Sequence, residues 1–321
     1  MLRSHTARAT RFIWFPALVG LLAGLNACGE STAPGGESAT LTVLLTDAPG
    51  NVDEVWVQVL EAYLQGGPDG RVTVLPFDDA RDLVELTSLA NTSMTLAQGV
   101  QLDPQTVSQF RMVIGEAAIV TTAGKIYSKD GGLPPVATLA DVDGPLTCPS
   151  CSQSGLKINL PDGTLTFDAG TNQVVVDFDV GQSVAHAAGS SGGWVMRPVV
   201  NGMDADETGS ISARIALAPG VSIPNCPTGE PRSLGDLRLI GVSETLRNGD
   251  GQPIRVSGKA DADGNLQITW VPTDRWQLEP GETLFDGPRI AFSVSNTPSV
   301  SVSTGGTAQA NYVVTNVTCD F

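Results

Sequence analysis

The segment Val55-Trp-Val-Gln-Val59 places three valines on one face of an extended chain. Alternation with a period of two is typical of a β-strand that has one buried face. The same alternation recurs along the sequence in both directions, whereas helical periodicity is weak. Before residue 205 it predicts further strands at 41–45, 71–75, 110–114, 125–127, 156–160, 164–167, 173–178 and 194–200. Only residues 78–90 could form a turn or two of helix.

Turn residues separate these strands. Gly-Gly-Pro-Asp-Gly at 66–70 precedes strand 71–75, and Pro161-Asp-Gly163 predicts a hairpin turn between 156–160 and 164–167. The chain becomes polar at 201–209, where we expect a domain boundary. A second series of strands is predicted at 210–217, 237–240, 254–256, 266–270, 289–294, 300–302 and 309–314. Such a series is typical of an antiparallel sandwich.

The composition agrees with a mainly β protein. The 321 residues include 36 glycines and 21 prolines, which favour turns over long helices, and 41% are hydrophobic, enough for a core. We expect two antiparallel β-sandwich domains, a β-rich one at 40–205 and a second at 206–321. The net charge of −16 makes nucleic-acid binding very unfavourable, because such binding depends on basic side chains.

The first 27 residues have the features of a secretory signal peptide. Three arginines and no acid precede an apolar run at 12–25, which is shorter than the roughly 20 residues that span a bilayer. The junction Leu25-Asn-Ala-Cys28 resembles the lipobox of bacterial lipoproteins. That resemblance implies that Cys28 is acylated, with chains such as palmitate, and becomes the first residue after cleavage. The alternative is an ordinary signal peptide with a chance cysteine nearby.

Residues 28–39 are small and polar and predict a flexible tether between lipid and folded body. Two or three acyl chains give stable membrane anchoring. Gly29, rather than an aspartate, follows the cysteine, and by resemblance to Gram-negative sorting this implies the outer membrane. The predicted location is therefore the cell envelope.

Four cysteines remain besides Cys28, an even number that suggests disulfides in an exported chain. Three pairings are possible. The simplest joins Cys148 to Cys151 in a small loop and Cys226 to Cys319 across the last domain. Free thiols, a redox pair or half of a zinc site are the alternatives, although zinc would need two more ligands.

The first body domain resembles DUF4382, a bacterial domain of unknown function. The resemblance covers about 40–203 and is most specific at Thr46-Asp-Ala-Pro49 and at the Asp-Phe-Asp segment 177–179. It implies an exported, often lipid-anchored, β-rich domain and no particular reaction.

No residues form a recognisable catalytic site, and no cofactor is expected. His186 is the single histidine after the signal peptide and is typical of a solvated loop residue. Four Asp-x-Asp pairs, at 141/143, 177/179, 204/206 and 261/263, could bind calcium or act as paired carboxylates, but most such acids lie in turns or in solvent. Trp56, Trp194, Trp270 and Trp276 could stack on sugars or fill the core.

These observations predict a non-enzymatic module, anchored by lipid, that binds a glycan or protein ligand or has a structural role. The alternative is a carboxylate-based hydrolase that acts on polysaccharide.

Overall fold

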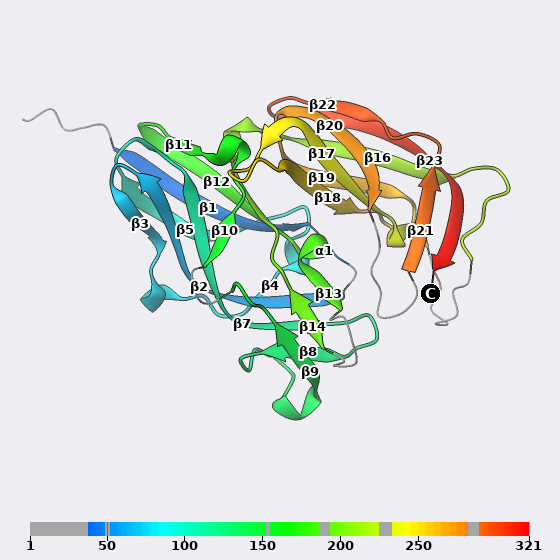
Figure 1. Cartoon of the computed structure of the whole chain (residues 1–321), viewed down its shortest axis with the longest axis horizontal. Helices are drawn as coiled ribbons and strands as arrows, with labels where there is room; N and C mark the ends of the chain where they lie inside the picture. Colours follow the sequence, from blue (N-terminus) through cyan, green and yellow to red (C-terminus); the bar gives the residue numbers. More distant parts are fainter. Residues whose placement is uncertain are drawn as a thin grey trace, which may run out of the picture. The chain divides into compact units, whose positions relative to one another are not determined.

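The computed structural model describes residues 38–48, 50, 52–151, 155–186, 193–224, 233–281 and 289–320. Within these residues the protein is mainly β, which confirms the expectation from the alternating sequence (Figure 1). The α-helix of the described part, α1, comprises four residues, Val180–Ser183. The signal peptide, Cys28 and almost all of the tether lie outside the described residues.

One four-stranded sheet contains the two segments most specific to the family resemblance. Its strands, in sheet order, are β15 (Val200–Asp204), β12 (Gly170–Asp179), β1 (Ala39–Ala48) and β5 (Met94–Leu102). In β1 the side chains of Leu41, Val43 and Leu45 are fully buried, and the residues between them are partly or fully buried. Each such buried side chain contributes about 1.5–3 kcal/mol relative to an exposed one.

A nine-stranded sheet supplies most of the remaining core before residue 200. Val55, Val57 and Val59 of β2 are buried together, as the opening segment predicts. The main path is β13 (Val184–His186), β14 (Trp194–Met196), β9 (Val142–Thr147), β8 (Ile126–Lys129), β7 (Gln109–Val120), β2 (Glu54–Gly67) and β3 (Gly70–Leu75), with β10 (Leu156–Ile158) on β7 and β4 (Val84–Glu85) on β2. A separate pair joins β11 (Leu165–Phe167) to β6 (Gln105–Val107). Buried side chains from all three sheets form one hydrophobic cluster.

The strands after residue 207 form two further four-stranded sheets with their own hydrophobic cluster. One has the order β19 (Asn265–Pro272), β16 (Thr208–Leu217), β23 (Thr307–Asp320), β21 (Arg289–Val294). The other has the order β18 (Pro253–Lys259), β17 (Arg238–Arg247), β20 (Asp274–Gly281), β22 (Ser299–Val302). Trp276 is fully buried in this cluster. A short 3₁₀ turn, Ala205–Glu207, separates β15 from β16, and the division into two domains there stays a prediction.

The expectation of purely antiparallel sheets is wrong. Four pairs are parallel: β1 with β12, β8 with β9, β9 with β14, and β16 with β23. Parallel neighbours need a long crossover connection. Groups of strands form it for three of these pairs, whereas the segment 130–141, with a 3₁₀ turn at Leu139–Asp141, joins β8 to β9. Alternation in sequence reports which face of a strand is buried, but it does not report the direction of the partner.

The predicted hairpin at Pro161-Asp-Gly163 is also wrong. The turn exists as a 3₁₀ segment with Asp162 at a φ of 54°. However, β10 before it pairs with β7, and β11 after it pairs with β6. In the segment 78–90, the structure has two 3₁₀ turns, Phe77–Asp79 and Thr87–Leu89, with the short strand β4 between them.

Candidate functional site

The two family-like segments meet at the ends of β1 and β12. These strands run side by side in parallel, with Thr46 opposite Asp177 and Ala48 opposite Asp179. Asp47, Asp177 and Asp179 are all buried. Three carboxyl groups therefore lie within one small region, where burial of a charge is costly unless it is paired.

Asp179 is paired by an arginine from the C-terminal sheets. Nη2 of Arg238, on β17, lies 3.3 Å from Oδ1 of Asp179 and donates to the hydroxyl of Ser257 at 2.6 Å. Ser257, on β18, in turn donates to Oδ2 of Asp179 at 2.7 Å. Gln182 also donates to this carboxylate from its backbone and its side chain. Asp179 is thus a fully hydrogen-bonded structural anion.

Gly181 makes room for this arginine. Nη1 of Arg238 donates to the carbonyl oxygen of Gly181 at 2.7 Å. A Cβ added at Gly181 would lie 1.8 Å from Nη2 of Arg238. Because only glycine lacks a Cβ, the guanidinium can lie against the backbone of α1.

Among the described residues, neither Asp47 nor Asp177 forms an ion pair of this kind, although the charge of Arg238 acts on Asp47. Oδ1 of Asp47 accepts a hydrogen bond from the backbone of Val180 at 3.1 Å, but its Oδ2 is buried without a hydrogen-bond partner among the described residues. Burial, reinforced by the neighbouring Asp177, raises the pKa of Asp47 well above its usual range. Burial and the nearby Asp179 raise the pKa of Asp177 to about 8. Asp177 is therefore largely protonated at neutral pH.

The cavity beside these two acids is small. It measures about 10 Å³ and is lined by Asp47, Asp177 and Ser257 together with Asn91 and Gln267. That volume accommodates about one water molecule.

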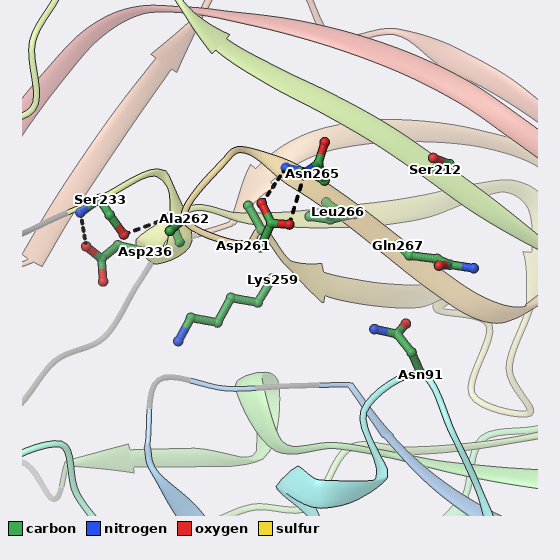
Figure 2. Close-up of a pocket in the computed structure, with 12 residues that line it drawn as sticks. Asn91, Ser212, Ser233, Asp236, Lys259, Asp261, Ala262, Asn265, Leu266 and Gln267 are labelled. Carbon is green, nitrogen blue, oxygen red and sulfur yellow. Dashed lines mark hydrogen bonds between the residues drawn. The ribbon is translucent and has the colours of Figure 1, made fainter.

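Asn91 and Gln267 also line a larger polar cleft. It has a volume of about 700 Å³, within the range of roughly 300–1,000 Å³ that is typical of ligand sites. Figure 2 shows the extended side chain of Lys259 below Asp261, and Asn91 on a loop from a different part of the chain. Burial lowers the pKa of Lys259, and the carboxylates of Asp236 and Asp53 oppose this effect.

The carboxylates that line this cleft are engaged in their own loops. Asp261 accepts hydrogen bonds from the backbone of Asp263 and from the backbone and side chain of Asn265, and these bonds lower its pKa. Asp236 accepts from the backbone of Ser233 in a capping box. Hydrogen bonds therefore stabilise the charged form of Asp261 and hold the carboxylate of Asp236 within its own loop.

Thr46, in the first family-like segment, fixes the loop that carries Asn91. The hydroxyl of Thr46 lies 3.2 Å from the carbonyl oxygen of Leu89 and 2.5 Å from that of Thr92. Ala90 forms a parallel bridge with Asp47. Asn91 is exposed at the tip with a φ of 59°, a conformation that asparagine tolerates better than most residues.

A third cavity, of about 350 Å³, adjoins Asn91 and Gln267 and is lined by Trp270. The β16–β19 register shifts between Gly209 and Ile211, so that two residues of β19 oppose one of β16. Trp270 has a φ of 57° at this bulge. Bulges change the direction of side chains, and here the tryptophan is only partly buried.

The other sequence-predicted residues lie elsewhere. Cys148 and Cys151 form a disulfide, and Cys319 is disulfide-bonded, while Cys226 lies outside the described residues. His186 ends β13, opposite Trp194. Trp194 and Trp276 are buried, and the indole of Trp56 donates to Glu54.

The Asp-x-Asp pairs other than 177/179 act in local turns and hydrogen bonds. The carboxylate of Asp141 accepts a hydrogen bond from the backbone N–H of Thr138, and that of Asp204 accepts one from the backbone N–H of Asp206. In the part of the chain that the structure describes, no group of three or more His, Cys, Asp or Glu side chains could hold a metal ion. Nor does any helix there have the length and apolarity needed to cross a bilayer.

Sequence reasoning missed Arg238, Lys259, Asn91 and Gln267. Arg238 and Gln267 lie within predicted strands, and a single polar residue there carries no signal of its partner. Asn91 directly follows the segment 78–90, in which a turn or two of helix is expected. Each residue acquires its role through tertiary packing, which composition and periodicity do not report.

The fold and the cleft define a mainly β protein with a polar cavity of ligand size. The chain belongs to the DUF4382 family, a domain of unknown function, whose family model matches residues 38–198. The family resemblance expected from the sequence is therefore confirmed. The match includes Asp47, Asn91 and Asp179, but it ends before Arg238 and Trp270.

No curated protein matches the chain. Among solved structures, the TIE protein of Bacillus anthracis is 9% identical with a TM-score of 0.20, covering 88% of this chain and 34% of that one. The major pilin subunit of Bacillus cereus is 9% identical with a TM-score of 0.24, covering 87% and 70%. A major pilin of Streptococcus pyogenes is 9% identical with a TM-score of 0.16, covering 88% and 97%. At these TM-scores the similarities carry no argument about function.

Proposed function

We propose that this protein is a non-catalytic binding module of the bacterial cell envelope, anchored by lipid on Cys28 and binding its ligand in the cleft beside Asn91 and Gln267. The observation that carries the binding role is a polar cleft of about 700 Å³ whose acidic side chains are already hydrogen-bonded within their own loops. Such a lining offers hydrogen-bond donors and acceptors to a ligand.

The anchor rests on the sequence. A basic start, an apolar run and a cysteine at the lipobox position favour lipidation of Cys28, and Gly29 after it favours the outer membrane. Mass spectrometry of the mature N-terminus tests this part. A diacylglyceryl cysteine at position 28 is expected, and an unmodified Cys28 or a different start would contradict it.

The alternative function, a carboxylate-based hydrolase, has one observation in its favour. Asp177 has a pKa of about 8 and could donate a proton at neutral pH. However, the cavity that reaches it measures about 10 Å³, which admits a water molecule and not a sugar ring. The geometry therefore favours binding over hydrolysis.

The two functions are separated by presenting the mature protein, kept in detergent, to an array of envelope components. The array contains peptidoglycan fragments, lipopolysaccharide, oligosaccharides and peptides, and a hydrolysis screen uses the same compounds. Retention of one component without turnover is expected. Turnover that Asp177→Asn abolishes would establish the hydrolase instead, and retention of none would refute the binding module.

A further inference from the structure

The groove formed by the two larger cavities has four side chains that make no hydrogen bond among the described residues. The two cavities, of about 700 and 350 Å³, share Asn91 and Gln267 as lining residues. The side chains of Asn91, Gln267, Lys259 and Trp270 make no hydrogen bond to any partner among the described residues, although Lys259 interacts electrostatically with Asp236 and Asp53. By contrast, Asp261 and Asn265 of the same lining are bound to each other.

We propose that this groove binds a neutral oligosaccharide, with Trp270 stacking on one sugar ring and the amides of Asn91 and Gln267 hydrogen-bonding to hydroxyl groups. This inference rests on the proposed function and specifies its ligand class.

Trp270 supplies the stacking surface. An indole face attracts the polarised C–H groups of a sugar ring, and its N–H remains available to a hydroxyl. The residue is partly buried and has a φ of 57°, which is unfavourable for a bulky side chain. The bulge in β19 lies at Trp270, which lines the same cavity as Asn91 and Gln267.

The two amides supply directional hydrogen bonds. An asparagine or glutamine side chain offers both a donor and an acceptor, which matches hydroxyl groups that need both. Gln267 is exposed on β19, and Asn91 lies opposite it on the loop held by Thr46 (Figure 2). Ser210 also lines the cavity of Trp270, and its hydroxyl is hydrogen-bonded to that of Thr307 at 2.8 Å.

The charge of the region favours a neutral sugar over an acidic one. The chain carries a net charge of −16, and Asp236 and Asp261 line the cleft. Lys259 is the cation in this lining, and the carboxylates of Asp236 and Asp53 already act on it. An acidic oligosaccharide would therefore be repelled, whereas a neutral one would accept hydrogen bonds from the ammonium.

The test is a titration of the mature protein in detergent with neutral hexasaccharides derived from glucan, xylan, mannan and chitin, and with hexagalacturonate as the acidic probe. Tryptophan fluorescence reports contact with the ring, and calorimetry reports affinity. Trp270→Gly removes the indole, and glycine accepts the positive φ, so this variant is expected to stay folded. Gln267→Ala is the second variant, and Asp130→Gly, at a φ of 55°, is the matched control outside the groove.

We expect one neutral hexasaccharide to bind and to change the fluorescence. Trp270→Gly is expected to weaken this binding about tenfold or more, and Gln267→Ala to weaken it several-fold, with Asp130→Gly unchanged. Equal binding by Trp270→Gly and wild type would contradict the proposal that the sugar binds in this groove. If none of the neutral hexasaccharides binds, the proposal that the ligand is a neutral oligosaccharide is wrong. In either case, retention of a peptide or lipopolysaccharide on the envelope array would leave the proposed function standing.

Discussion

Removing the guanidinium of Arg238 is expected to destabilise the protein strongly. Arg238 and Asp179 are 2% and 0% exposed, so Arg238→Met leaves a buried carboxylate without its cation. Breaking such a pair typically costs about 3–5 kcal/mol. Gln182 and Ser257 still donate to Asp179, which favours the lower end of that range. For a protein of this size, a loss of about 3 kcal/mol corresponds to a decrease in Tm of roughly 6–12 °C.

The assay is a double-mutant cycle with urea and thermal unfolding of the mature protein. Arg238→Met and Asp179→Asn are each expected to lower the free energy of unfolding by about 3 kcal/mol. The double variant should lose less than the sum of the two, because no buried charge is left unpaired. Arg275→Met is the matched control, since Arg275 pairs with Glu244 while 62% exposed and should change stability by less than about 1 kcal/mol.

Two results would refute the reasoning. One is a loss below about 1 kcal/mol for Arg238→Met, which would mean that the carboxylate is not desolvated in solution. The other is strict additivity in the cycle, which would mean that Arg238 and Asp179 do not interact.

Further predictions follow from the same region and from the N-terminus. Gly181→Ala should destabilise the protein, because its Cβ would lie 1.8 Å from the Arg238 guanidinium; a melting temperature equal to that of wild type would argue against the close approach. The raised pKa of Asp177, about 8, means that the folded state retains a proton that the unfolded state releases near pH 4, so stability should fall as pH rises from about 4 to 8. Asp177→Asn should flatten this profile, and an unchanged slope in denaturation curves would count against it. Cys28→Ser should shift the protein from the membrane fraction to the soluble fraction, and continued membrane association after carbonate washing would contradict lipid anchoring.

The faces of the strands could be predicted from the sequence, because a period of two directly reports burial on one side. The segments around Val55 and Ile211 are therefore found where alternation places them. Strand β20 was missed, although Trp276 and Leu278 alternate as buried residues, because charged residues at 274, 275 and 279 and Pro280 mask the pattern. Pairing direction was not predictable, since it depends on neighbours that are far apart in the sequence.

Only some residues of the candidate site could be predicted from the sequence, and their arrangement in space could not. The segments at 46–49 and 177–179 stand out in sequence, but their meeting depends on the parallel register of β1 and β12. The sequence does not distinguish Trp270 from the other three tryptophans as a candidate for sugar stacking. The structure does, because Trp270 lies at a bulge whereas Trp194 and Trp276 are buried. A local kink of this kind arises from one unmatched residue in a ladder, and no period in the sequence encodes it.

The position of β15 limits how the family segment can be produced by itself. The family match ends at residue 198, whereas β15 begins at Val200 and covers one side of β12 along five residues. A polypeptide cut at residue 198 would leave β12 as an open edge, which readily recruits strands from other molecules. It would also lack the arginine that neutralises Asp179. Recombinant work on this family segment should therefore retain the sheets that follow it, and aggregation of the shorter piece would say nothing about the solubility of the intact protein.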